Sequence, residues 1–198
     1  MDDSKNKEFN HLKIHTQYSI CEGALKIDEL KDYCKNNKVK CLGLSDTSNL
    51  FGALEFSDAI SKSGTQPIIG TQVNFKFKEV TGLIPLIALN ENGYKKLIEI
   101  SSKSYLKSED GTGPVCKIED LFEKKDGLVV FSGSIQGLIG KLFNSNKYDY
   151  IEEIYQKLAN IYKENFYLEI QRHDDENEKL FENFNLKKSK DLKIPIIA

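Results

Sequence analysis

Three polar side chains alternate near the start of the chain, at His11, Lys13 and His15, in the segment His-Leu-Lys-Ile-His-Thr-Gln-Tyr-Ser. Alternate residues of a β-strand lie on one face, so we expect these three side chains to point the same way. Imidazole nitrogens ligate metal ions, whereas a protonated ammonium has no lone pair to offer. The segment therefore indicates a polar pocket in which two residues favour a metal ion and one opposes it.

The elements that must position this pocket alternate between strand and helix. The spacing of apolar residues predicts helices over 26–37, 52–63, 90–105, 118–123, 135–143, 148–165 and 174–190. It predicts strands over 8–15, 39–45, 67–77, 83–89, 127–131, 166–171 and 194–198. Gly64 is expected to end one helix and Asn90 to cap the start of another. The alternation predicts a parallel sheet covered by helices, either open or closed into a barrel. Functional groups then gather at the carboxyl ends of strands, where Asp46, Gln72, Ser134 and His173 fall.

The composition limits the classes of function. A net charge of −2 argues against binding DNA through the overall field of the protein. Cys21, Cys34, Cys41 and Cys116 form no C-x-x-C pair, so zinc-knuckle and thioredoxin sites are disfavoured and reduced thiols are expected. No signal peptide begins the sequence and no apolar run approaches the length of a membrane span, so we expect a cytoplasmic protein with no membrane partner.

An ordered set of motifs resembles the PHP (polymerase and histidinol phosphatase) domain, in the form found at the N-terminus of bacterial replicative DNA polymerase III alpha subunits. The motifs lie at 9–19 with Glu22-Gly23, and at 42–56, 67–73, 86–97, 127–133 and 166–171. The resemblance covers nearly the whole chain. It implies an α/β fold, a distorted (β/α)7 barrel, with one PHP domain over residues 1–198 and flexible residues 1–7. The chain stops inside an apolar run, at Ile-Pro-Ile-Ile-Ala198, so we expect a fragment of a longer polymerase that lacks its last strand or strands by truncation.

In metal-binding members of the family, the resemblance implies a pocket that holds up to three metal ions through His, Asp, Glu and Cys side chains. This chain departs from that pattern at several positions. Lys13 and Thr47 replace histidines, Gln72 replaces a glutamate, and Ser134 replaces a cysteine. The predicted pocket, with the substituted and the retained residues together, consists of His11, Lys13, His15, Glu22, Asp46, Thr47, Gln72, Ser134 and His173.

These substitutions remove two imidazoles, one carboxylate and one thiolate, which are most of the electron-pair donors that a metal cluster needs. We therefore expect no resident cofactor. A weakly bound Zn, Mn or Mg ion would have only His15, Asp46 and His173 as remaining ligands. Lys13 is expected to form an ion pair with Asp46, which would keep the pocket neutral without a metal.

Several residues allow a structural reading beside the functional one. His15 is either a residual ligand or a hydrogen-bonded pocket histidine, and His11 is expected to be structural. The acids that follow His173 favour a helix N-terminus, with Asp174 as its cap, and the role of His173 itself stays open. The segment 46–49 either binds phosphate through backbone N–H groups or forms a turn. The lysine pairs at 95–96, 124–125 and 187–188 are expected on solvated faces.

The first hypothesis for function is a non-catalytic PHP domain of a DNA-directed DNA polymerase, a nucleotidyltransferase whose own active site lies outside these residues. By resemblance, its partners are the rest of the polymerase alpha chain, the epsilon proofreading exonuclease and, through the full-length protein, DNA. A second hypothesis is an active metal-dependent phosphoesterase or 3′–5′ exonuclease, which the retained His15, Glu22, Asp46 and His173 motivate. A third is a vestigial phosphate-binding module built around Lys13.

Overall fold

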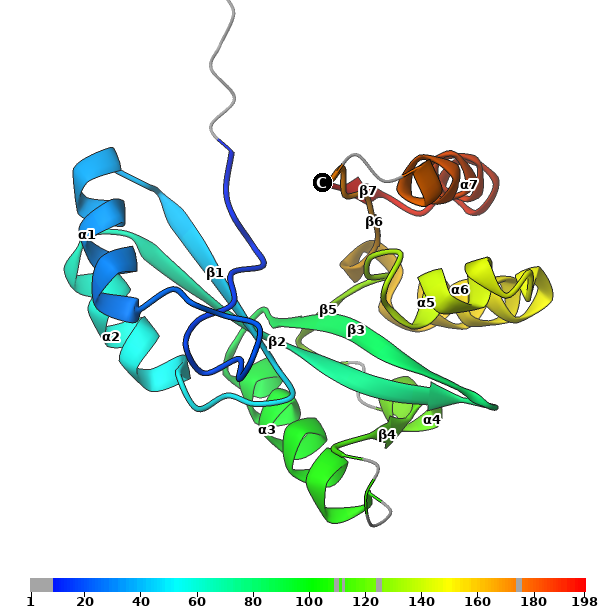
Figure 1. Cartoon of the computed structure of the whole chain (residues 1–198), viewed down its shortest axis with the longest axis horizontal. Helices are drawn as coiled ribbons and strands as arrows, with labels where there is room; N and C mark the ends of the chain where they lie inside the picture. The colour runs from blue at the N-terminus through cyan, green and yellow to red at the C-terminus, as the bar shows by residue number, and fades with distance from the viewer. Residues whose placement is uncertain (1–8, 109–110, 112, 124–125, 174–175) are drawn as a thin grey trace, which may run out of the picture.

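The computed structural model describes residues 9–108, 111, 113–123, 126–173 and 176–198. The described residues form an α/β fold whose curled sheet has the strand order β1-β2-β3-β5-β6-β7, with β4 paired to β2 (Figure 1). The strands are β1 (Cys41–Thr47), β2 (Gln66–Phe77), β3 (Val80–Ala88), β4 (Cys116–Lys117), β5 (Leu128–Phe131), β6 (Phe166–Glu169) and β7 (Ile196–Ile197). The helices are α1 (Ile27–Asn37), α2 (Ala53–Lys62), α3 (Glu91–Leu106), α4 (Ile118–Glu123), α5 (Leu138–Asn144), α6 (Tyr148–Tyr162), the 3-10 turn η1 (Lys163–Asn165) and α7 (Glu176–Leu192).

The helices lie close to the ranges that apolar spacing predicts. Helix α1 buries Ile27, Leu30 and Cys34 on one stripe. The Asn90 side chain accepts a hydrogen bond from the Gly93 N–H at 3.0 Å, which confirms it as the N-cap of α3. Just past α2, Gly64 has a φ of +82°, the left-handed conformation that commonly ends a helix.

The prediction of a uniformly parallel sheet is wrong at β3, which runs antiparallel to both β2 and β5. Only Lys78 and Glu79 separate β2 from β3, and a connection this short can join only antiparallel strands. Lys78 adopts the positive φ of 53° that tight hairpins require, although it is not a glycine. The two-residue strand β4, which was not predicted, pairs parallel to the far end of β2.

The predicted first strand is also corrected, because its described part forms an extended segment with isolated bridges from Ile14 to Leu44 and from Thr16 to Leu25. The segment still runs parallel to β1. The Ile14 N–H donates to the Gly43 carbonyl at 2.9 Å, and the Gly43 N–H donates to the His11 carbonyl at 2.7 Å. A Cβ at Gly43 would meet the Leu12 carbonyl oxygen at 2.5 Å, so glycine permits this close approach.

The core lies mainly between the sheet and helices α3 to α6, while α1 and α2 lie together beyond β1 (Figure 1). Alternate residues of β5 divide between the two faces of the sheet. Leu128 and Val130 pack into the large helix-covered core, whereas Val129 and Phe131 belong to a small cluster on the concave face, with Ile87. The concave face therefore has a thin apolar floor, and the polar residues of the predicted pocket lie beside it. Among the residues that the model describes, no helix is long and apolar enough to cross a membrane.

Candidate functional site

A polar cavity of about 430 Å³ collects most of the predicted pocket residues. It is lined by Lys13, His15, Glu22, Gln72, Ser134 and His173, together with Gln171 and Gln136. These residues come from the N-terminal segment, from β2, and from the segments that follow β5 and β6. The expectation that functional side chains gather beyond the carboxyl ends of strands holds for Ser134 and His173, which follow β5 and β6, whereas Gln72 lies within β2.

Lys13 forms a largely buried ion pair with Glu169 of β6. The Lys13 Nζ atom lies 2.7 Å from Glu169 Oε1, and the two side chains are 18% and 6% exposed. Gln171 Nε2 donates to the same oxygen at 2.5 Å, while the other carboxylate oxygen of Glu169 is buried and has no hydrogen-bond partner in the structure. The backbone N–H of Glu169 donates to Ser132 Oγ at 2.9 Å, which fixes the strand end that carries the carboxylate.

The predicted Lys13–Asp46 pair is wrong, because Asp46 is occupied by other donors. Its Oδ1 accepts from the Thr16 N–H at 2.7 Å and from Ser19 Oγ at 2.6 Å, and its Oδ2 accepts from Thr16 Oγ1 at 2.8 Å. Asp46 is fully buried. Its carboxylate therefore anchors residues 16–19 to the end of β1, and this loop follows directly after His15.

His15 is held at both ring nitrogens. Gln72 Nε2 lies 3.1 Å from His15 Nε2, and an amide nitrogen can only donate, so the imidazole nitrogen accepts this bond. The ring proton is then on Nδ1, which faces Ser19 Oγ at 3.4 Å. The lone pair on Nε2 that would ligate a metal ion is engaged by the Gln72 amide.

Burial also disfavours the charged form of His15. Desolvation lowers its pKa below the ordinary value of 6.5, and the nearby Lys13 ammonium lowers it further. Glu22 opposes this effect, since its Oε2 lies 3.9 Å from His15 Nδ1. The net direction is downward, so His15 is neutral at pH 7.

Glu22 and Ser134 line the cavity, and Thr47 is hydrogen-bonded to Glu22 without being among the lining residues. Thr47 Oγ1 donates to Glu22 Oε2 at 2.5 Å, and the Thr47 N–H donates to Ser19 Oγ at 3.1 Å. Ser134 Oγ accepts the Gln136 N–H at 3.3 Å within a local turn. These bonds join the lining residues to the backbone on both sides of the pocket.

The two remaining histidines lie at the edge. His11 stacks edge-on against Phe9, with ring centroids 4.8 Å apart, and lines a neighbouring hollow of about 510 Å³ together with Lys13 and Ile197. His173 is 70% exposed, and its Nδ1 lies 2.8 Å from Glu178 Oε1 of α7. The expected cap at Asp174 lies outside the described residues.

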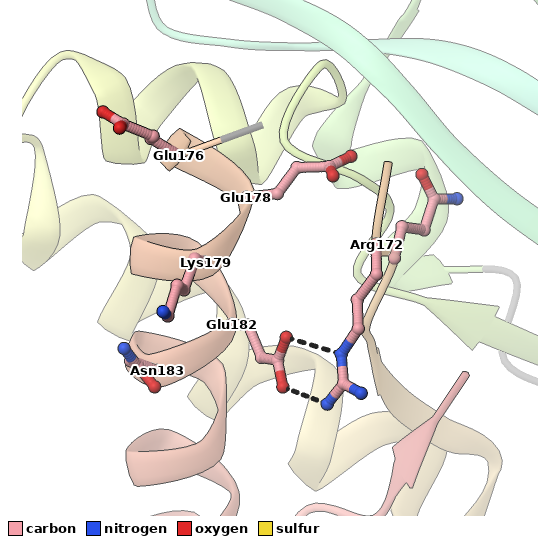
Figure 2. A pocket seen from close by; sticks show the side chains of 7 residues that line it. Arg172, Glu176, Glu178, Lys179, Glu182 and Asn183 are labelled. Carbon is pink, nitrogen blue, oxygen red and sulfur yellow. Dashed lines mark hydrogen bonds and ion pairs between the residues drawn. The ribbon is translucent and has the colours of Figure 1, made fainter. Parts of the chain in front are cut away.

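A further hollow of about 430 Å³ separates the segment after β6 from the first turns of α7 (Figure 2). Arg172 spans it with two hydrogen bonds to Glu182, from Nε at 3.0 Å and from one terminal nitrogen at 2.6 Å. Figure 2 shows Glu178, the residue that holds His173, one helical turn before Glu182 on the same helix. These contacts attach the segment after β6 to α7.

The segment 46–49 and the lysine pairs have local structural roles. Asn49 Oδ1 accepts the Phe51 N–H at 3.0 Å, so the turn that follows the segment lies at 49–51, while Asp46 and Thr47 end β1. Lys95 is exposed and pairs with Glu91, as expected for a solvated helix face, whereas Lys188 is partly buried in its pair with Glu152. Residues 124–125 lie outside the described residues. Within the described part of the chain, no group of three or more His, Cys, Asp or Glu side chains is arranged to hold a metal ion.

The sequence matches the family model of the PHP domain over residues 11–173. The chain belongs to the PHP domain family. The matched range contains every residue of the predicted pocket, and its ends are His11 and His173.

Several curated relatives share the name DNA polymerase III subunit alpha. The chain is 34% identical over 192 residues to the DNA polymerase III subunit alpha of Rickettsia felis, and the matched region covers 96% of this chain and 16% of that protein. It is 33% identical to the corresponding protein of Caulobacter vibrioides (87% and 16%) and 31% identical to that of Helicobacter pylori (98% and 17%). The chain thus spans about one sixth of the length of these relatives.

Solved structures share the fold at low identity. A structure described as a metal-dependent phosphoesterase from Bifidobacterium adolescentis matches with a TM-score of 0.60 and 10% identity, over 94% of this chain and 85% of that one. A two-domain protein with a PHP-like part from Bacteroides vulgatus matches with a TM-score of 0.59 and 13% identity, over 95% and 50%. The PHP-type α/β fold expected from the sequence is confirmed.

The sequence interpretation missed Glu169, which is the buried partner of Lys13. A signal for it was present, because Glu169 continues the alternation of Tyr167 on the face opposite Phe166 and Leu168. Thr16 and Ser19 were missed as well. Their hydroxyl groups bond to Asp46 across 30 and 27 residues, and no local spacing indicates such a contact.

Replacing Lys13 with Met should lower the free energy of unfolding by about 3 kcal/mol, because it leaves the Glu169 carboxylate buried without its cation. The double variant Lys13→Met/Glu169→Leu should recover most of that loss. Urea denaturation measures both, with Lys62→Met as the control, since Lys62 forms an exposed pair with Asp58. A loss in Lys13→Met no larger than in the control would contradict a stabilising role for the ion pair.

The lowered pKa of His15 predicts a specific loss of stability in acid. Below pH 6.5, His15 is protonated in the unfolded chain while it stays neutral in the folded chain. The free energy of unfolding therefore falls as the pH decreases towards the pKa of His15 in the folded state. The slope contributed by one proton is at most about 1.4 kcal/mol per pH unit. Urea denaturation above and below pH 6.5 should therefore show that the free energy of unfolding decreases more in the wild type than in His15→Asn. The control is His173→Asn. An imidazole NMR titration that placed the His15 midpoint above 6.5 would refute the assignment.

Proposed function

We propose that this chain is the PHP domain of a bacterial DNA polymerase III alpha subunit and that its pocket is not catalytic. The observation that carries the proposal is the ion pair, 2.7 Å long, between Lys13, which lines the cavity, and the buried Glu169. In the metal-binding pattern of the family, a histidine ligand stands at position 13. A fixed ammonium group at that position repels a divalent cation and supplies no lone pair.

The other donors of the pocket support the same conclusion. The Nε2 lone pair of His15 accepts from Gln72, and both carboxylate oxygens of Asp46 are engaged by Thr16 and Ser19. A divalent ion would have to break these bonds and displace the ammonium before it gained enough ligands for a stable site. The residues present therefore do not fit the metal cluster of the catalytic members.

The role that remains is structural support of chromosomal replication. In this proposal the rest of the alpha chain carries the DNA-directed polymerase activity and contacts DNA, while these residues form its N-terminal domain in the cytoplasm. The length of the relatives, about six times that of the matched part, supports a larger protein around it. Phosphoesterase or 3′–5′ exonuclease activity is the competing function, and metal content distinguishes the two.

The purified protein, incubated with Mn²⁺ or Zn²⁺ and then desalted, should retain less than one metal ion per chain by elemental analysis. It should also release no nucleotide from a 3′-labelled oligonucleotide. The matched variant restores the family ligands through Lys13→His, Thr47→His, Gln72→Glu and Ser134→Cys, and should retain more metal than the wild type because it regains donors. Two or more ions in the wild type, or nucleotide release that His15→Ala abolishes, would establish the catalytic function instead.

We also propose that the domain docks the epsilon proofreading exonuclease, the partner that the family resemblance implies. Two segments in contact, joined by a 2.9 Å bond from Asn49 Nδ2 to the Tyr18 carbonyl, present exposed apolar side chains. Ile20, Phe51 and Leu54 are 80%, 69% and 81% exposed. Large apolar side chains grouped on a surface are typical of protein–protein contacts.

The double variant Phe51→Glu/Leu54→Glu should weaken co-elution with the purified epsilon subunit by at least about tenfold in affinity, as expected when apolar anchors are lost from an interface. Leu106→Glu is the matched control, since Leu106 is 86% exposed at the end of α3. Binding that is unchanged in the double variant, or lost equally in the control, would rule out this surface.

A further inference from the structure

A cavity of about 330 Å³ lies at the far end of the β2–β3 hairpin, outside the polar pocket described above. It is lined by Lys76, Thr81, Lys107, Ser108, Lys117 and Asp120, with Cys116 at its wall. Lys76 follows Gln72 by four residues on the same strand, which places it about 13 Å further along β2. No residue of the cavity belongs to the predicted PHP pocket.

The register of the sheet brings two lysines of this cavity face to face. Lys76 of β2 is the Cα partner of Lys117 in the parallel β2–β4 pair, so both side chains leave the same face of neighbouring strands. Both residues are exposed, and their neighbours Phe75 and Cys116 are buried on the opposite face. Like charges directly opposite each other in a sheet are destabilising unless a counter-charge lies between them.

A third ammonium group closes the cavity. Lys107 is exposed and immediately follows α3. Lys141 adds positive potential nearby, since its Nζ donates to the Thr81 carbonyl at 2.9 Å. No ion pair within the described residues involves Lys76, Lys107 or Lys117.

The carboxylate of the cavity is already engaged. Asp120 Oδ1 forms an ion pair with Lys103, and Asp120 Oδ2 accepts the Lys117 backbone N–H at 3.1 Å. The wall adds no negative charge, because burial raises the pKa of the Cys116 thiol to about 11 and keeps it protonated. Among the described lining residues, the cavity therefore holds a surplus of positive charge.

We propose that this cavity is an anion site that takes a phosphate group, held by Lys76, Lys107 and Lys117. The chemistry is that of a phosphate oxyanion, which relieves the repulsion between the register-paired lysines. The phosphate comes either from a nucleic-acid backbone or from a small phosphate-bearing ligand. The site is separate from the polar pocket, so this proposal does not depend on the proposal that the pocket is non-catalytic.

The test uses the whole chain and two probes, a fluorescent single-stranded oligothymidylate and inorganic phosphate. Anisotropy at low salt should show binding to the oligonucleotide, and the affinity should fall as salt rises, with a log–log slope of about −2 for three contacts to a single strand. Lys76→Gln/Lys117→Gln should weaken binding about tenfold. The matched control is Lys62→Gln/Lys95→Gln, which removes the same charge from two exposed helix pairs.

The outcomes separate the two sources. Oligonucleotide binding that phosphate does not displace assigns the site to a nucleic-acid backbone. Phosphate-induced NMR shifts at the Lys117 amide, lost in the lysine double variant, with no oligonucleotide binding, assign it to a small ligand. Equal weakening in the control, or no response to either probe, overturns the proposal. Thermal unfolding adds a second readout, since phosphate should raise the midpoint of the wild type more than that of the double variant.

Discussion

The ion pair between Lys13 and Glu169 joins the N-terminal extended segment to β6 across the concave face of the sheet. It connects residues separated by 156 positions, in a cavity where one charge without the other would be costly. Glu169 is in turn fixed by Ser132 through its backbone and by Gln171 through its carboxylate. The pair therefore sets the position of the N-terminal segment and the charge of the pocket at once, and the non-catalytic interpretation depends on it.

Much of the fold could be predicted from the sequence, because helices and strands have distinct apolar periods. Helix α4, for example, occupies the predicted residues 118–123. The antiparallel course of β3 was missed, since the prediction placed the start of this strand at Leu83 and left room for a longer connection, whereas the strand begins at Val80 directly after the turn. The N-terminal segment was predicted as a full strand because its alternation is correct, but its pairing with β1 is interrupted to form the loop that Asp46 anchors.

The sequence predicted most of the residues that line the candidate site, but it did not predict which side chains pair with each other there. Family motifs brought Lys13, His15 and Gln72 to one cavity, as the structure places them. They gave Lys13 the wrong partner, because Asp46 and Glu22 were the retained acids with assigned motifs, whereas Glu169 lies in a strand motif that carries no assigned ligand. Buried charge pairing depends on which side chains face each other across a curved sheet, and this geometry is not encoded in local spacing.

The most direct measurement is a crystal structure of this chain grown with excess Mn²⁺, with anomalous scattering recorded to locate the metal. The account predicts that Lys13 Nζ stays within hydrogen-bond distance of Glu169 and that the polar pocket shows no anomalous peak. A structure in which the lysine has moved out, and in which manganese is bound by Glu169 and His15, would contradict it.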